Sequence, residues 1–197
     1  EAVCAGPENV APVLTRAVGL GADHGIRVHR EEAPFPDPFG TASLIAACAR
    51  ERGCDLVLCG VMSEDLMQGQ VGPMLAEMLD LPSLTAVVAT RLSPDGKQMD
   101  VEREIEGGRR EKWTIRLPAL LTLQSGINTP GYPALSRRLL AVRKSHETIG
   151  QKAPASPRIL QRVVRTGLPE KQRAGRVLEG TRAGKADALL AIFREKG

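Results

Sequence analysis

The sequence predicts an α/β fold built on an open, mostly parallel sheet with helices on both faces. Before Pro82, short apolar runs alternate with helical patterns in the order strand, helix, strand, helix, strand. This order is typical of parallel strands joined by right-handed crossovers. The third run, Asp55 to Cys59, is almost wholly apolar, as expected for a buried parallel strand. A chain of 197 residues, 42% of them hydrophobic, can form one such domain with extensions.

Glycine, proline and apolar spacing delimit the elements of this first part. Strands are expected at residues 1–5, 25–29 and 55–59, and helices over residues 10–18, 42–49 and 74–81. Thr41 is expected to cap the second helix, because a hydroxyl just before a helical pattern can accept a backbone N–H. Pro73 suits the first turn of the third helix.

After Pro82 the pattern changes to short strands separated by turns. The expected strands are residues 85–92, 99–105 and 112–117, divided by Ser93-Pro-Asp-Gly96 and Gly107-Gly108. This spacing predicts an antiparallel meander appended to the parallel sheet. A further apolar run follows at Ala119 to Leu123, and a basic helix is expected from Ala134 to Lys144.

The composition of the C-terminal part predicts an arm. From Gly150 to Gly180 the chain is polar and rich in proline, glycine and arginine. Such a stretch buries too little apolar surface to fold alone, so it is either disordered or an extended arm laid on another subunit. A final helix, Ala183 to Glu195, offers one apolar face. We therefore expect an α/β domain over residues 1–149 and an arm with its helix over residues 150–197.

Composition excludes several function classes. The net charge is only +4 and aromatic residues make up 3% of the chain, which argues against a nucleic-acid partner. None of the four cysteines forms a C-x-x-C pair, so reduced, buried thiols are expected. No apolar stretch approaches the roughly 20 residues that span a bilayer, and no signal-like segment is visible. The sequence thus predicts a soluble protein of a reducing compartment.

The loop from Gly60 to Pro73 is the best candidate for a ligand site. It follows a predicted buried strand and precedes a helix, and Gly60, Gly69 and Gly72 would let a ligand approach the backbone closely. Free amides at the helix start favour a phosphate. The loop matches neither a Walker A nor a G-x-G-x-x-G motif, and its spacing alone favours a tight turn over a phosphate site.

Catalytic and metal sites are not expected. Glu102, Arg103, Glu104 and Glu106 alternate with apolar residues before a Gly-Gly turn, so solvent-facing hairpin charges are the simpler interpretation. The three histidines lack the partners of a catalytic triad. In the basic helix, the pattern alone favours leucines packed on the core with arginines outside.

One segment resembles a known family. Val101-Glu-Arg-Glu-Ile-Glu-Gly-Gly-Arg-Arg-Glu111, followed by Leu117-Pro-Ala-Leu-Leu-Thr122, resembles the signature of the electron transfer flavoprotein beta subunit. Trp113 departs from it, because the family usually has an aliphatic residue there. The resemblance covers nearly the whole chain, including Gly6-Pro7, Gly21-Ala-Asp-His-Gly25, Asp55 to Gly60, Gln70-Val-Gly72, Asn128 with Pro130 and Tyr132, and Ala174-Gly175.

The resemblance implies a Rossmann-like fold, similar to the adenine nucleotide alpha hydrolases, and an electron carrier without catalytic residues of its own. The family's beta subunit forms a heterodimer with an alpha subunit that holds most of the FAD. It binds AMP as a structural nucleotide or, in bifurcating members, a second FAD. Client dehydrogenases supply the electrons. The implied compartment is the bacterial cytoplasm, or the mitochondrial matrix in a eukaryote.

Three sets of site residues follow from the resemblance. The expected nucleotide-binding residues are Ala5, Gly60, Ser63, Glu64, Asp65, Gln68, Gly69, Gln70, Val71 and Gly72. Arg103 and Glu104 are expected on the side of the flavin and the alpha subunit. A recognition loop over residues 131–145 would dock client dehydrogenases through Leu135, Arg137, Arg138 and Leu139.

The nucleotide loop also departs from the family. Val61 stands where Lys or Arg is common, and residues 66–69 replace a run of acidic, hydroxyl and amide side chains. An interaction subunit that has lost its nucleotide is therefore an alternative, as is a nucleotide-hydrolysing or adenylylating enzyme of the same fold. Family members begin with an additional strand and helix, and Glu1 aligns inside the fold, so we expect that segment to be missing here.

Overall fold

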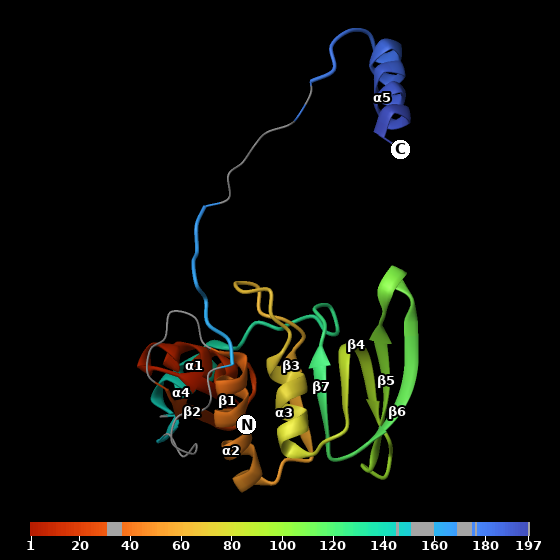
Figure 1. Cartoon of the computed structure of the whole chain (residues 1–197). Helices are drawn as coiled ribbons and strands as arrows, with labels where there is room; N and C mark the ends of the chain where they lie inside the picture. Colours follow the sequence, from red (N-terminus) through yellow and green to blue (C-terminus); the bar gives the residue numbers. More distant parts are fainter. Residues whose placement is uncertain (31–36, 145, 151–159, 169–174, 176, 197) are drawn as a thin grey trace. The chain divides into compact units, whose positions relative to one another are not determined.

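The computed structural model describes residues 1–30, 37–144, 146–150, 160–168, 175 and 177–196. It divides into two units, Glu1–Arg162 and Val163–Gly197. The first unit contains both sheets, and the second contains α5 (Arg182–Lys196), drawn in blue in Figure 1. Residues 150–197 were expected to form an arm, and the part of them that falls at 151–159, 169–174, 176 and 197 lies outside the described residues.

The smaller sheet is entirely parallel. It consists of β1 (Ala2–Gly6), β2 (Gly25–His29) and β8 (Glu147–Ile149), in the order β1-β2-β8. A 3-10 turn (Glu8–Val10) leads into α1 (Ala11–Leu20), which packs against α4 (Leu135–Arg143). On the face of α2 (Pro38–Arg52), Ile26 and Val28 of β2 pack against Leu44 and Cys48.

The larger sheet joins a parallel part to an antiparallel meander. Its order is β3-β7-β4-β5-β6, with β3 (Leu56–Gly60), β7 (Ala119–Leu123), β4 (Ser83–Leu92), β5 (Gln98–Glu104) and β6 (Arg110–Arg116). β4 runs parallel to β7 and antiparallel to β5, so it belongs to both parts. The meander, drawn in green in Figure 1, confirms the expectation from the sequence.

Each face of the larger sheet has its own apolar core. On one face, Leu120 of β7 packs with α2 and with Leu75 and Ala76 of α3 (Val71–Leu79). On the other face, Leu121 of β7 packs with apolar residues of the meander, among them Val87, Met99, Val101 and Ile115. The two cores use alternate residues of β7, as expected for a strand buried on both faces.

A bulge in β4 connects the two pairing modes. The register of β4 shifts between Val87 and Ala89 on the side of β5, and between Leu84 and Val87 on the side of β7. Ala86 adopts a φ of 57°, and its N–H donates to the buried Thr122 hydroxyl at 3.2 Å. The bulge takes the N–H of Ala86 out of the hydrogen bonding between strands, and the hydroxyl of Thr122 accepts it instead.

Several sequence-based expectations were wrong in detail. Asp37, not Thr41, caps α2: its carboxylate accepts the N–H of Gly40 at 2.8 Å, and Pro38 occupies the first turn without an N–H to satisfy. Thr41 lies inside the helix and donates to the carbonyl of Asp37. The third helix begins at Val71 and ends at Leu79, earlier than expected, although Pro73 does lie in its first turn.

The strands form two sheets and not one. Among the described residues, β1 pairs only with β2, and β3 pairs only with β7. β3 is consequently an edge strand, and Leu58 is 55% exposed where a fully covered strand was expected. β8 was not expected at all, because its three residues are too few and too polar to give a strand pattern.

Candidate functional site

The loop between β3 and α3 lies at the carboxyl end of a parallel strand pair, where ligands of open α/β sheets bind. The N–H of Val61 donates to the carbonyl of Leu123 at 3.0 Å, which fixes the start of the loop to the end of β7. Beyond it, the Ser63 N–H donates to the Gln68 carbonyl at 3.0 Å, and the Gln68 N–H approaches the Ser63 hydroxyl at 3.4 Å. The loop is therefore closed by its own hydrogen bonds.

The glycines of this loop serve the protein's own packing. A Cβ at Gly69 would lie 2.7 Å from the carbonyl oxygen of Val61, and a Cβ at Gly72 would lie 2.5 Å from Cγ2 of Thr122. Both contacts are too short for any side chain, so the two glycines are required without a ligand. At Gly60 a Cβ would meet no atom within 4 Å. Packing within the protein therefore accounts for Gly69 and Gly72, whereas it does not account for Gly60.

Within the described part of the chain, the first N–H groups of α3 have no acceptor. Its N-cap residue is Gln70, whose side chain makes no capping hydrogen bond. The first helical hydrogen bond runs from the N–H of Met74 to the carbonyl of Gln70, at 3.1 Å. The N–H groups of Val71 and Gly72 precede that bond and have no intrahelical acceptor. Amides at a helix start of this kind suit a phosphate.

The remaining nucleotide residues of the sequence prediction are spread over two sheets. Ser63, Glu64 and Asp65 are exposed in the loop, and Asp65 accepts the N–H of Leu66 at 2.8 Å. Ala5 is half-buried in β1 and packs against the cluster that contains Ile26 and Val28. No strand pairing within the described part of the chain joins Ala5 to the loop.

A second surface surrounds α4. Leu135 is 69% exposed, Leu139 and Leu140 are also exposed, and only Ala141 of this helix is buried, against Gly19 of α1. The alternative in which these leucines pack on the core is wrong, because α4 contacts α1 through its small residue. A cleft of about 440 Å³ beside this contact is lined by residues of α1, of α4 and of the segment before α4, namely Pro12, Thr15, Arg16, Gly19, Tyr132, Pro133, Arg138 and Val142.

Arg103 and Glu104 lie at the end of β5, beside the 3-10 turn Glu106–Gly108. The guanidinium of Arg103 is half-buried, and its Nε lies 3.5 Å from the carboxylate of Glu111 on β6. That Nε is buried and makes no hydrogen bond. Glu104 is exposed. Glu102 pairs with Arg110 and Lys112 across the hairpin, as expected for solvent-facing hairpin charges.

Burial affects the thiol nearest to the loop. Cys59 is half-buried in β3 and packs towards α3, and burial raises the pKa of its thiol. Burial also raises the pKa of Cys4 and of Cys48, although the neighbouring Arg52 opposes the effect at Cys48. These thiols are thus kept protonated, which suits a structural role better than nucleophilic chemistry.

No group of three or more His, Cys, Asp or Glu side chains among the described residues could hold a metal ion. In the same part of the chain, no helix has both the length and the apolar character needed to cross a membrane.

Comparison with known families decides the assignment. A family model described as the electron transfer flavoprotein domain matches residues 1–154, which include the loop, the meander and α4. The chain belongs to the electron transfer flavoprotein family. The match confirms the resemblance carried by the segment from Val101 to Thr122.

Curated relatives place the chain among the beta subunits of that family. It is 31% identical to the electron transfer flavoprotein subunit beta of Bacillus subtilis, covering 99% of this chain and 77% of the relative. The subunit beta of Methylophilus methylotrophus is 30% identical, over 98% of this chain and 75% of the relative. The subunit beta of Sus scrofa is 35% identical, over 75% of this chain and 58% of the relative.

Proposed function

We propose that this chain works as the beta subunit of an electron transfer flavoprotein, paired with an alpha subunit to carry electrons from dehydrogenases to an acceptor. The observation that carries the proposal is the family match over residues 1–154, together with beta-subunit relatives that align with nearly the whole chain. The FAD of the alpha subunit would supply the redox chemistry. This chain would shape the flavin's surroundings and supply docking surfaces, without a catalytic group of its own.

The loop after β3 is our candidate for a second nucleotide, AMP or a second FAD. The fit rests on the unpaired N–H groups of Val71 and Gly72, which would hold a phosphate. Gly60 leaves open space beside them. Ser63, Glu64, Asp65, Gln68, Gly69 and Gln70 would surround the ribose and phosphate, and Ala5 would lie by the base.

A subunit without nucleotide is the second candidate, and one observation favours it. The bonds between Ser63 and Gln68 close the loop on itself, and the contacts at Gly69 and Gly72 account for two of its glycines. Mass analysis of the denatured, purified complex separates the possibilities. AMP or a second equivalent of FAD would support the nucleotide site, whereas FAD alone would support the second candidate.

We assign the docking of client dehydrogenases to α4 and the residues before it. The apolar side chain of Leu135 is exposed at the start of the helix, and Leu139 follows one turn later. Arg137 and Arg138 are exposed beside them. An apolar anchor among cations suits a binding hot spot with electrostatic steering. Ser145, the last residue of the expected recognition loop, lies outside the described residues.

We propose that the C-terminal part of this chain contacts the alpha subunit. In α5, Leu189, Leu190 and Phe193 are all exposed. An isolated helix of this length is marginal in water unless it packs on another surface. We propose that Arg103 and Glu104, at the end of β5, face the same partner, where their charges would help to position the flavin domain. The proposed division is residues 1–149 as the nucleotide-binding domain and 150–197 as the arm.

Co-purification from the native source tests the proposal as a whole. We expect a larger, yellow flavoprotein to accompany the chain in equal amount, from the cytoplasm of a bacterium or the mitochondrial matrix of a eukaryote. The isolated pair should be reduced by a dehydrogenase of that source. A full-length chain that runs alone and colourless would contradict the proposed function.

A further inference from the structure

β6 is the outermost strand of the larger sheet, and pairs with β5 alone among the described strands. Two backbone bonds show which of its groups face β5: Ile105 N–H donates to the Arg109 carbonyl, and Leu117 N–H to the Lys97 carbonyl, both at 2.9 Å. Hydrogen-bonded pairs alternate along an antiparallel ladder, so the residues bonded to β5 are Glu111, Trp113 and Ile115. The backbone groups that face away from the sheet belong to Arg110, Lys112, Thr114 and Arg116.

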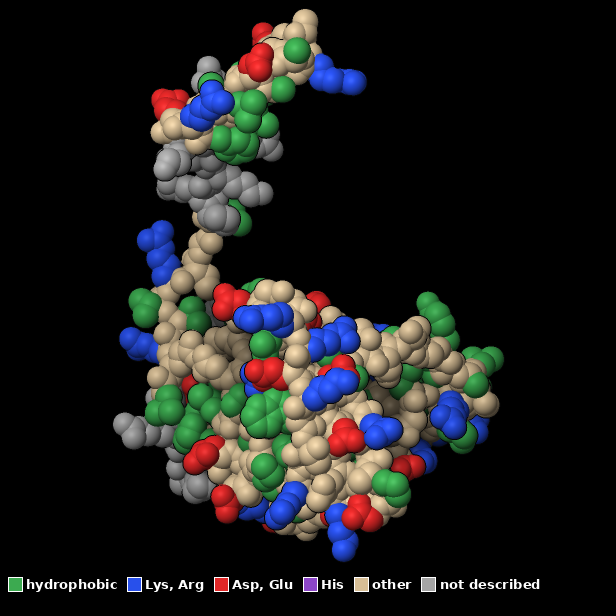
Figure 2. Space-filling view, turned by 90° about the vertical axis from the view of Figure 1, so that its right-hand side faces the viewer, with side chains coloured by type: hydrophobic (Ala, Val, Ile, Leu, Met, Phe, Trp, Pro, Cys, Tyr) green, Lys and Arg blue, Asp and Glu red, His purple; other side chains and the backbone are tan. Residues whose placement is uncertain are grey.

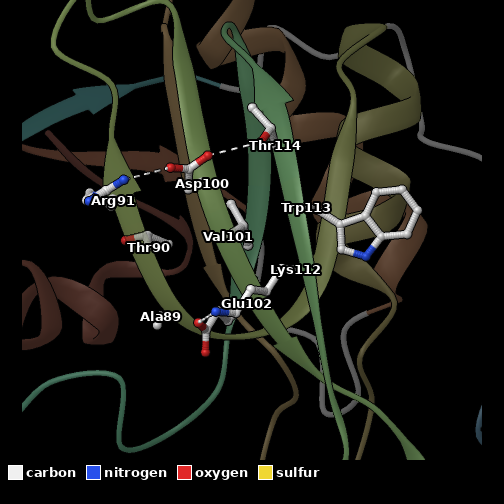
Figure 3. A pocket seen from close by; sticks show the side chains of 9 residues that line it. All are labelled: Ala89, Thr90, Arg91, Asp100, Val101, Glu102, Lys112, Trp113 and Thr114. Carbon is white, nitrogen blue, oxygen red and sulfur yellow. Dashed lines mark hydrogen bonds and ion pairs between the residues drawn. The ribbon is translucent and has the colours of Figure 1, made fainter.

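The side chains of β6 sort onto two different faces. On the polar face, Lys112 Nζ lies 3.3 Å from Glu102, and the Thr114 hydroxyl donates to Asp100 at 3.0 Å (Figure 3). On the opposite face, the indole N–H of Trp113 donates to Glu111 at 3.1 Å, and Figure 3 shows Trp113 pointing away from Asp100 and Thr114. The free edge thus presents cations on one face and a half-exposed indole on the other.

We propose that β6 is extended by a strand of the alpha subunit whose side chains alternate between acidic and apolar. This inference rests on the proposed function and adds the element by which the two subunits join. The unpaired backbone groups of β6 would bond to the incoming strand, as in other cases of strand addition. Its acidic side chains would lie opposite Lys112 and Arg116, and its apolar side chains beside Trp113.

The charges on the polar face favour an acidic strand. Glu102 is shared between two cations of β6, at 3.3 Å from Lys112 and 3.7 Å from Arg110. Among the described residues, Arg116 forms no ion pair. Of these cations, Lys112 lines a groove of about 500 Å³ across β4, β5 and β6, and Arg91 of β4 lines it as well (Figure 3). In Figure 2, which looks at this side of the molecule, cationic side chains are spread among acidic and apolar ones.

A second copy of the chain is the less suitable occupant. Antiparallel pairing of β6 with itself, centred on Trp113, sets Arg110 opposite Arg116 twice. Centring on Lys112 sets two lysines opposite one another, and centring on Thr114 sets Lys112 opposite Arg116. Like charges directly opposite each other destabilise a strand pair.

Hydrogen exchange in the full-length chain, alone and in the alpha–beta complex, tests the proposal. We expect the outward amides of Lys112 and Thr114 to exchange at least about tenfold more slowly in the complex. The emission of Trp113, the single tryptophan of the chain, should shift to shorter wavelength at the same time. A flavin-containing complex in which both amides keep their free exchange rates would overturn this inference and leave the proposed function standing.

Other outcomes are equally decisive. If no complex with an alpha subunit forms, the proposed function and the inference fail together. If the amides of β6 become protected at high concentration of this chain alone, the occupant is a second copy and the inference is wrong.

Two variants and one control variant sharpen the test. Arg116→Glu should weaken alpha-subunit binding about tenfold, whereas Lys97→Glu, the same charge change in the neighbouring turn, should not. Thr114→Pro removes an N–H that faces away from β5, together with the exposed hydrogen bond from the Thr114 hydroxyl to Asp100, and an edge strand tolerates such a proline. It should therefore reduce binding while the circular dichroism of the free chain stays unchanged. If Arg116→Glu and Thr114→Pro both bind the alpha subunit as tightly as the parent chain does, the proposal is overturned.

Discussion

Gly72 sets the distance between α3 and β7. The added methyl of Gly72→Ala would lie 2.5 Å from Cγ2 of the buried Thr122, and neither element can move easily because each packs on a core. Overpacking of this kind costs about 1–3 kcal/mol, so we expect the free energy of unfolding to fall by that amount. Urea denaturation measures it. The control is Gly60→Ala, with no atom within 4 Å of the added Cβ, and equal losses in the two variants would contradict this interpretation.

At the same scale, Cys59 gives a dependence of stability on pH. Burial raises the pKa of its thiol above the ordinary 9.0, so the folded state holds the proton more tightly than the unfolded state. The resulting contribution to stability is complete below the unfolded pKa and is lost as pH rises through the folded pKa. Urea unfolding at about pH 8 and about pH 10.5 should show the loss. Cys59→Ala should show a smaller one, and identical pH dependence in both proteins would refute the effect.

At the scale of elements, α4 separates docking from folding. Leu135 is 69% exposed and the helix is held to α1 through Ala141, so Leu135→Ala should leave thermal stability and flavin content unchanged. Reduction of the complex by its client dehydrogenase should fall about tenfold, as for a moderate hot spot. Stopped-flow reduction measures this. Leu92→Ala, an exposed leucine of β4, is the matched control, and loss of flavin in Leu135→Ala would argue against the docking role.

Elements with strong local signals could be predicted from sequence, and the others could not. β2 and β7 match their expected residues because Gly25 opens one and Pro118 precedes the other. The cap of α2 was misplaced because Asp37 and Thr41 are both good caps, and only the geometry shows which carboxylate or hydroxyl meets a free N–H. β8 depends on β2, far away in the sequence, and carries no pattern of its own.

The candidate site also has features that the sequence predicts and features that it does not. The position of the loop between β3 and α3 was predicted correctly because strand, glycines and helix follow one another in the sequence, and its nucleotide-binding role stays a prediction. The roles of Gly69 and Gly72 were not predictable, because they depend on the Val61 carbonyl and the Thr122 methyl, which only the folded chain brings close. The exposure of Leu135 likewise depends on how α4 meets α1, since its spacing fits a buried face equally well.

For the whole molecule, the position of β4 determines how the larger sheet can come apart. β4 bonds to β7 on one side and to β5 on the other, and its residue Val87 is buried in the core that β7 shares with the meander. The meander therefore cannot separate from the parallel part without exposing that core to solvent. We conclude that the parallel part and the meander unfold as one cooperative unit. A partner bound at β6 would make this unfolding rarer, so the amide hydrogens of β7 would also exchange more slowly.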